Sequence, residues 1–223
     1  QLHESSDPEH SRLDPLGLVS LTAGLFCLIL GLIEGNQHGW TSGLIVSLLV
    51  AGVVVLALFI ASQARDRATM IDLSLFKRPA FVGAQTTAFA ISASMFAMFL
   101  YLTLYLQNIL GLSPLETGVR FLPLSLVSFF AAPLAGRLSH TVPVRALISI
   151  GLALNAIAMW TMSRVSTGSH WTVLLPGFII GGIGIGFVNA PLATTAVSTV
   201  RVERAGMASG INNTFRQIGI ATG

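Results

Sequence analysis

The chain has 223 residues, of which 53% are hydrophobic and only 9% are charged, and its mean hydropathy is +0.78. A soluble domain carries roughly 25% charged residues because its surface faces water, so this composition excludes an ordinary soluble fold. The net charge of +3 does not indicate nucleic-acid binding, because the basic residues lie in short gaps between apolar runs and form no patch. This alternation is typical of an α-helical membrane protein.

The first apolar run, residues 15–34, would form a helix about 30 Å long, which matches the hydrocarbon thickness of a bilayer. Asp14 followed by Pro15 is a typical helix start. A short polar turn that ends in Trp40 separates this run from a second one at residues 43–62. We therefore expect a polar linker at 1–14 and two transmembrane helices within 15–62.

Residues 63–78 combine the densest charge of the chain with interleaved apolar residues, which predicts an amphipathic loop at the membrane surface. Beyond this loop, a turn is predicted at 108–112, and Ser113 and Glu116 have the spacing of a capping box. Further spans are expected at 79–106, 116–138, 143–163 and 171–197, with a truncated seventh from Ala205. The predicted fold class is all-α, a polytopic transmembrane helical bundle with about six full spans.

The distribution of basic residues predicts the orientation of these helices. If the N-terminal end is cytoplasmic, nine of the 12 basic residues fall in cytoplasmic gaps and only Arg164 falls outside. Such a bias is the positive-inside signature, so residues 1–14 and 63–78 are predicted to be cytoplasmic. The nine are Arg12, Arg65, Arg67, Lys77, Arg78, Arg137, Arg145, Arg201 and Arg204.

No pattern in the sequence indicates an enzyme, a cofactor or a metal site. The single cysteine, Cys27, lies in an apolar run, and the five histidines are scattered. The glycines of 181–186 lack the spacing and the strand-to-helix setting of a dinucleotide loop. They form GxxxG pairs instead, as do Gly206 and Gly210, which indicates either static helix packing or a sliding interface.

Polar residues inside the spans are the best candidates for a functional role, because burying them in hydrocarbon is costly. Arg120 either snorkels to the outer interface or lines a cavity. Arg216, with Asn212, Asn213 and Gln217 beside it, forms a cluster too polar to face lipid. This cluster lies either near the inner interface or toward a wet interior. Single amides are either helix–helix contacts or substrate contacts. The candidate translocation residues are Gln85, Arg120, Asn155, Asn189, Asn212 and Arg216.

Two segments carry distinctive motifs: residues 105–118 have the pattern YLQxxxGxSPLxxG, and residues 205–219 have the pattern AGxASGxxNxxRQxG. With these motifs the chain resembles the fourteen-helix drug:proton antiporter branch of the major facilitator superfamily, the EmrB/QacA type. The likeness covers nearly the whole chain after residue 13. It implies that 15–62 are two extra helices between the halves, and that 79–223 are five helices of the second half, with the first half of the polypeptide missing.

The resemblance also implies a cytoplasmic gate loop that contains Gly136, Arg137 and Arg145, although His140 replaces the usual aspartate. The expected function is secondary active transport in the plasma membrane, in which drugs or other small amphipathic molecules leave by proton-coupled alternating access. Its partners would be a small-molecule substrate, protons and the lipid bilayer. Two alternatives remain: a carrier of a defined metabolite, and a non-transporting membrane receptor or scaffold.

Overall fold

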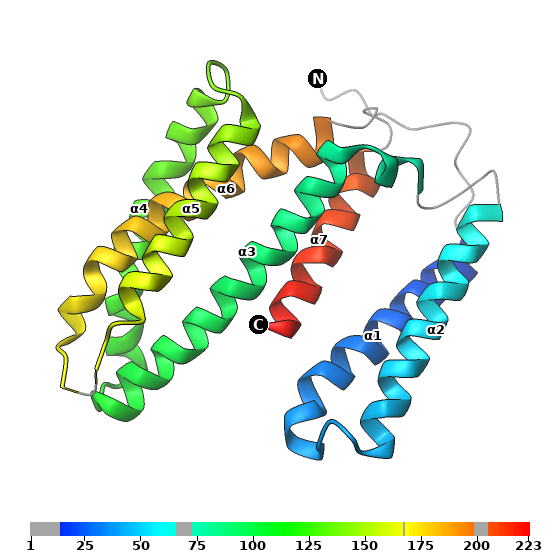
Figure 1. Ribbon diagram of the computed structural model, residues 1–223, viewed down its shortest axis with the longest axis horizontal. Coiled ribbons are helices and arrows are strands. Elements are labelled where there is room, and N and C mark those ends of the chain that lie inside the picture. The colour runs from blue at the N-terminus through cyan, green and yellow to red at the C-terminus, as the bar shows by residue number, and fades with distance from the viewer. Residues whose placement is uncertain (1–13, 66–72, 167, 199–204) are drawn as a thin grey trace. The chain divides into compact units, whose positions relative to one another are not determined.

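The computed structural model describes residues 14–65, 73–166, 168–198 and 205–223 (Figure 1). Every regular element in these ranges is a helix, and six of the helices are long and apolar enough to cross a membrane. The predicted all-α transmembrane fold is therefore confirmed. Most of the predicted linker and part of the predicted surface loop lie outside the described residues.

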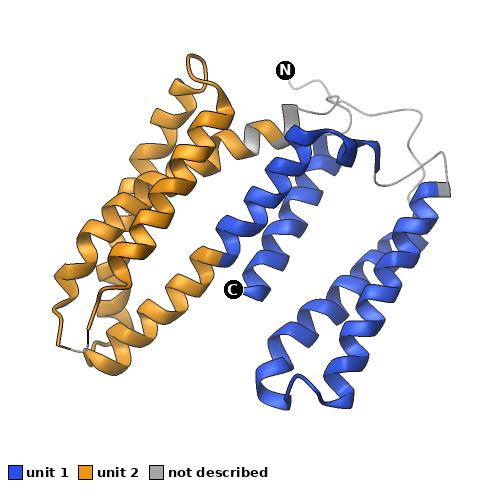
Figure 2. Cartoon of the chain, in the orientation of Figure 1, with its two compact units in different colours: residues 1–93, 197–223 blue, residues 94–196 orange. Residues whose placement is uncertain are grey.

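The chain forms two compact units, shown in Figure 2. Unit 1 comprises residues 1–93 and 197–223, and unit 2 comprises residues 94–196. The domain boundaries implied by the resemblance, at residues 14, 62 and 78, stay a prediction.

Unit 1 contains a hairpin of α1 (Pro15–His38) and α2 (Gly43–Arg65). The buried residues of α1 are all glycines, and the Leu56 and Leu49 side chains of α2 pack onto Gly24 and Gly31. Small residues permit this close helix approach within lipid. Asp14 caps α1 as predicted, accepting from the Gly17 amide at 2.7 Å, and its second oxygen accepts from Gln63 Nε2 of α2 at 2.9 Å.

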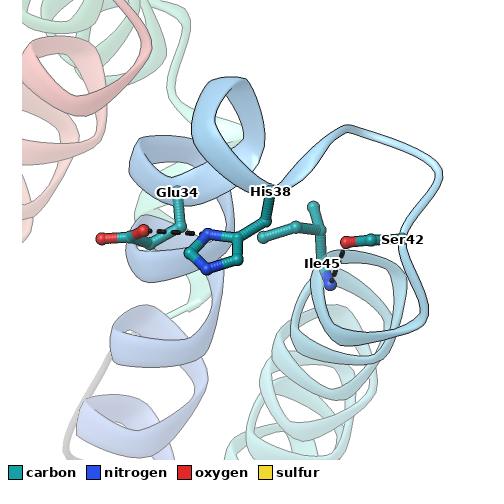
Figure 3. A network of polar contacts seen from close by, with 4 residues as sticks. All are labelled: Glu34, His38, Ser42 and Ile45. Carbon is teal, nitrogen blue, oxygen red and sulfur yellow. Dashed lines mark hydrogen bonds and ion pairs between the residues drawn. The ribbon is translucent and has the colours of Figure 1, made fainter.

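The turn between α1 and α2 is shorter than expected, because residues 35–38 are helical. Two side-chain contacts hold this last turn: Glu34 with His38 at 3.1 Å, and Trp40 Nε1 donating to Asn36 at 3.1 Å. Gly39 then ends the helix with a φ of 82°. Figure 3 shows the Glu34–His38 pair beside Ser42, whose hydroxyl accepts from the Ile45 amide at the start of α2.

The rest of unit 1 is the short 3₁₀ helix η1 (Leu73–Lys77), the first part of α3 (Pro79–Leu104), and α7 (Ala205–Thr222). α7 lies beside α3 in Figure 1. Leu75 of η1, Phe81 of α3, and Ala208 and Ile211 of α7 are buried together. The described part of the predicted surface loop is thus anchored to the helices by Leu75.

Unit 2 contains the end of α3, a π-helical turn η2 (Tyr105–Ile109), α4 (Pro114–Leu138), α5 (Val144–Met162), η3 (Trp171–Leu174) and α6 (Leu175–Ser198). Its apolar core draws on all of these elements. The buried core residues are Leu102, Leu106, Leu124, Met162, Leu174, Phe178 and Ile185. The predicted Ser113–Glu116 capping box opens α4.

The predicted turn at 108–112 begins too early, because the helix continues to Ile109 as a π turn. The Leu110 amide donates to the Tyr105 carbonyl at 3.1 Å, and Gly111 makes the actual turn with a φ of 68°. The Tyr105 hydroxyl lies 3.0 Å from both the Ser166 and the Ser169 carbonyl oxygens. This contact with the loop after α5 holds the extra helical turn in place.

The glycines of α6 contact two different helices of unit 2. A Cβ atom at Gly182 or Gly186 would collide with α4, and one at Gly184 would collide with Asn155 and the Gly151 carbonyl of α5. A larger side chain at these positions would force the helices apart. By contrast, a Cβ at Gly206 or Gly210 of α7 would meet no described atom within 4 Å.

Candidate functional site

Three of the sequence candidates form one chain of hydrogen bonds within unit 1. Asn212 of α7 donates through Nδ2 to Gln85 Oε1 of α3 at 3.1 Å. Arg216 donates through Nε to Asn212 Oδ1 at 3.2 Å. Gln85 is 1% exposed and Asn212 is 7% exposed, so the polar chain lies inside the helix contact.

Arg216 fixes the orientation of both amides in this chain. A guanidinium group has only donors, so the Asn212 oxygen must face Arg216 and its nitrogen must face Gln85. Gln85 then turns its oxygen to Asn212, which leaves Gln85 Nε2 as the end of the chain. This nitrogen is buried and has no hydrogen-bond partner among the described residues.

The close approach of α7 to α3 explains how the chain becomes buried. Gly219 packs against the Phe89 carbonyl and Ser92 of α3, leaving no space there for a side chain. One helical turn on the other side, Ala208 and Ile211 pack with Phe81. The two buried amides are therefore flanked by tight helix contacts on both sides.

Arg120 belongs to unit 2 and has a different environment. Its Nη1 donates to the Glu116 carbonyl at 3.0 Å, and its guanidinium carbon lies 5.4 Å from the centre of the Trp171 ring. Its Nε is buried and has no hydrogen-bond partner among the described residues. The arginine is thus held in place by a cation–π contact and a backbone contact.

The two amide candidates of unit 2 lie on neighbouring helices. Asn155 of α5 donates to the Gly151 carbonyl of its own helix at 3.0 Å, and it packs against Gly184 of α6. Asn189 is half-buried on α6. The Asn155 contacts are those of helix packing, whereas the Gln85 and Asn212 contacts join two helices through polar atoms.

The residues of the predicted gate loop lie at the end of α4 and the start of α5. Arg137 and Arg145 are exposed, and the Gly136 carbonyl accepts from the Ser139 hydroxyl at 2.6 Å. Within the described ranges, no ion pair joins either arginine to a carboxylate. Both cations are therefore available at the surface of unit 2.

Two functional-looking contacts were not expected from the sequence. The aromatic ring under Arg120 comes from Trp171, which is distant in sequence, so no local pattern indicates it. The Glu34–His38 pair has the i, i+4 spacing of a helix contact. That spacing could have been recognised if residues 35–38 had been assigned to the helix.

The sequence matches the family description "Major Facilitator Superfamily" over residues 8–223. It is 32% identical over 222 residues to the Multidrug resistance protein Stp of Mycobacterium tuberculosis, covering 100% of this chain and 41% of that protein. It is 35% identical over 216 residues to the Cephamycin export protein CmcT of Amycolatopsis lactamdurans, covering 95% of this chain and 44% of that protein.

A third relative, the Tetracenomycin C resistance and export protein of Streptomyces glaucescens, is 28% identical over 210 residues, with coverages of 94% and 39%. The chain thus spans about two fifths of the length of the curated relatives it matches.

Proposed function

Because this chain belongs to the Major Facilitator Superfamily, we propose that the protein containing it exports drugs or other small amphipathic molecules. It would be a secondary active transporter that works by alternating access, with the proton gradient as its energy source. The names of three relatives support export as the direction, since they describe multidrug resistance, cephamycin export, and tetracenomycin C resistance and export. Membership of this family, together with six apolar helices, supports a multi-pass membrane transporter and argues against an enzyme.

The polar chain of Gln85, Asn212 and Arg216, in which both amides are buried, is the observation that carries the proposal. Polar groups inside a membrane bundle are expensive and persist where a polar path or a partner requires them. Here a cation and two amides are oriented so that donors point along the α3–α7 contact. A substrate with a carbonyl or carboxylate oxygen would find complementary donors when these helices separate.

The other candidate residues have supporting roles in this proposal. Arg120, fixed by Trp171, would present a positive charge near the outer end of α4. Asn155 and Asn189 would contribute to the path or to packing in unit 2. Gly136, Arg137 and Arg145 would form the cytoplasmic gate loop, in which two exposed cations pair with acidic groups of another part of the transporter.

The finer assignment is the fourteen-helix EmrB/QacA-type branch in the plasma membrane. Residues 15–62 would be its two extra helices, and residues 1–14 and 63–78 would face the cytoplasm. Glu34 and Glu116 lie near the ends of their spans. We therefore place the proton-coupling carboxylate in the first half of the transporter, which this chain needs as a partner.

The test uses the full-length protein in a drug-sensitive bacterial host, with growth inhibition and fluorescent-substrate efflux as readouts. Arg216→Leu is expected to reduce efflux at least about tenfold, because it removes the donor that orients Asn212 and Gln85. Arg120→Leu is expected to reduce it less. Arg164→Leu is the matched control, since Arg164 is exposed just after α5 and stacks on Trp160 of that helix.

The same assay separates the alternatives. A protonophore should abolish efflux if protons drive it, and persistent efflux would contradict proton coupling. A profile limited to one metabolite class would favour a metabolite carrier. Full activity of the Arg120→Leu, Arg216→Leu double variant would remove the basis for a polar path in this chain.

A further inference from the structure

Unit 1 contains a cavity of about 700 Å³ that lies outside the polar chain. Its walls come from the α1–α2 hairpin, from η1 and from α7, and include Leu25, Phe59, Phe76 and Phe215. The volume falls within the range that holds small ligands, about 300–1,000 Å³. The two faces of α7 therefore differ: one holds Asn212 against α3, and the other borders this cavity.

Water is a poor occupant of the cavity. Thr214 is the only polar side chain among the described residues that line it, and its hydroxyl already donates to the Gly210 carbonyl at 3.1 Å. A buried water needs two to four polar partners, roughly, and the lining does not supply them. The occupant must therefore be apolar where it contacts these walls.

The cavity continues into the lipid-facing surface of the protein. Ile60 and Phe76, which line it, are 52% and 37% exposed, and the neighbouring Leu58 of α2 is 65% exposed. These residues belong to or adjoin helices that cross the hydrocarbon layer. An acyl chain can pass from the bilayer into the cavity along apolar side chains alone.

Two basic residues follow directly in the chain after a wall of the same cavity. η1 contributes Leu73 and Phe76 to the lining and ends at Lys77, which Arg78 follows, and both basic residues are exposed. Since η1 connects two membrane spans, it lies at a membrane surface, where lipid phosphates are found. Basic residues at this level attract anionic headgroups.

We propose that this cavity binds one anionic phospholipid, with an acyl chain between the hairpin and α7 and with the phosphate at Lys77. The lipid would join the α1–α2 hairpin to α7 through apolar contacts. Gly206 and Gly210 make room for it, because a Cβ at either position meets no described atom within 4 Å.

Native mass spectrometry of the purified full-length protein in detergent tests the proposal, with palmitoyl-oleoyl phosphatidylglycerol and the matching phosphatidylcholine as probes. Gly206→Leu combined with Gly210→Leu fills the cavity and should weaken binding of both lipids by about tenfold. Lys77→Gln should weaken phosphatidylglycerol alone by about fivefold. Lys77→Arg should retain the preference for phosphatidylglycerol.

Gly83→Leu is the matched control, because Gly83 is an exposed helical glycine of α3 whose added Cβ also meets nothing within 4 Å. It should bind both lipids as the unmodified protein does. Unchanged lipid binding in the cavity-filled variant would overturn the site. Equal loss of both lipids in Lys77→Gln would overturn the headgroup assignment.

Discussion

At the scale of single residues, Asn212 is the centre of the polar chain because it accepts from Arg216 and donates to Gln85. Its amide supplies both an acceptor for Arg216 Nε and a donor for Gln85 Oε1. Gln85 Nε2 is already without a partner among the described residues. Replacing Asn212 would therefore remove both hydrogen bonds of the polar chain at once.

We predict that Asn212→Leu lowers the free energy of unfolding by about 1–3 kcal/mol, because the buried Gln85 Oε1 loses its donor and Arg216 Nε loses the Asn212 acceptor. Asn213→Leu is the control, since Asn213 is the exposed neighbour on the same helix turn. Thermal unfolding of both full-length variants in detergent measures the difference. Equal stability of the two variants would show that the hydrogen bonds of Asn212 contribute no net stability to the protein.

The sequence identified Arg216 and Asn212 as one polar cluster, and Gln85 as a separate polar residue in an apolar setting. The pairing of Gln85 with Asn212 could not be predicted, because residues 85 and 212 come together only through the packing of α7 on α3. The same holds for the Arg120–Trp171 contact. Whether these residues form a transport path stays a prediction.

At the scale of elements, the closest approaches to α3 are made by Gly219 of α7 and by Gly223, which follows α7. A Cβ at Gly219 would collide with the Phe89 carbonyl and approach Ser92, and both lie on the α3 backbone or close to it. Backbone atoms of a helix cannot move aside as a flexible side chain can. The polar chain one to two turns away therefore depends on this position.

We predict that Gly219→Ala destabilises the protein by about 1–3 kcal/mol, as overpacking does, and lengthens the Asn212–Gln85 contact. Gly83→Ala, which has open space, should instead be neutral or stabilising by up to about 1 kcal/mol. Thermal unfolding and substrate efflux of the full-length variants check both expectations. A stable, active Gly219→Ala variant would contradict the tight contact.

The length of the apolar runs was enough to predict the membrane-spanning helices. It did not predict where two of these helices end. Residues 35–38 are polar, and polarity suggested a turn, but side-chain contacts from Glu34 and Asn36 extend the helix. Residues 105–109 form a π turn held by Tyr105 contacts with a distant loop. Local sequence cannot report stabilisation that comes from another part of the fold.

At the scale of the whole molecule, the basic residues predict which side of the membrane each loop faces. In a Cys27→Ser background, His140→Cys should react with a membrane-impermeant maleimide only after the cells are permeabilised. His170→Cys should react in intact cells, because it follows the next span. Both positions are exposed, so the reverse labelling pattern would invert the topology.

Family membership and the helical fold could be inferred from the sequence. The length of the apolar runs and the family motifs can both be read along the chain itself. The arrangement within each unit could not. The cavity in unit 1 is an example, since its walls come from four elements of which η1 and α7 are separated by most of the chain. The apolar pattern of a sequence does not show which apolar helix faces pack together and which leave a cavity between them.

The hydrogen bond between Asp14 and Gln63 closes the α1–α2 hairpin across 49 positions of chain. The two helices are joined by residues 39–42 alone, so closing the hairpin costs little loop entropy, and the glycine face of α1 finds its partner within the next span. We therefore expect the hairpin to be able to assemble before α3 has been synthesised. It would enter the bilayer as a finished pair, onto which the later helices are built.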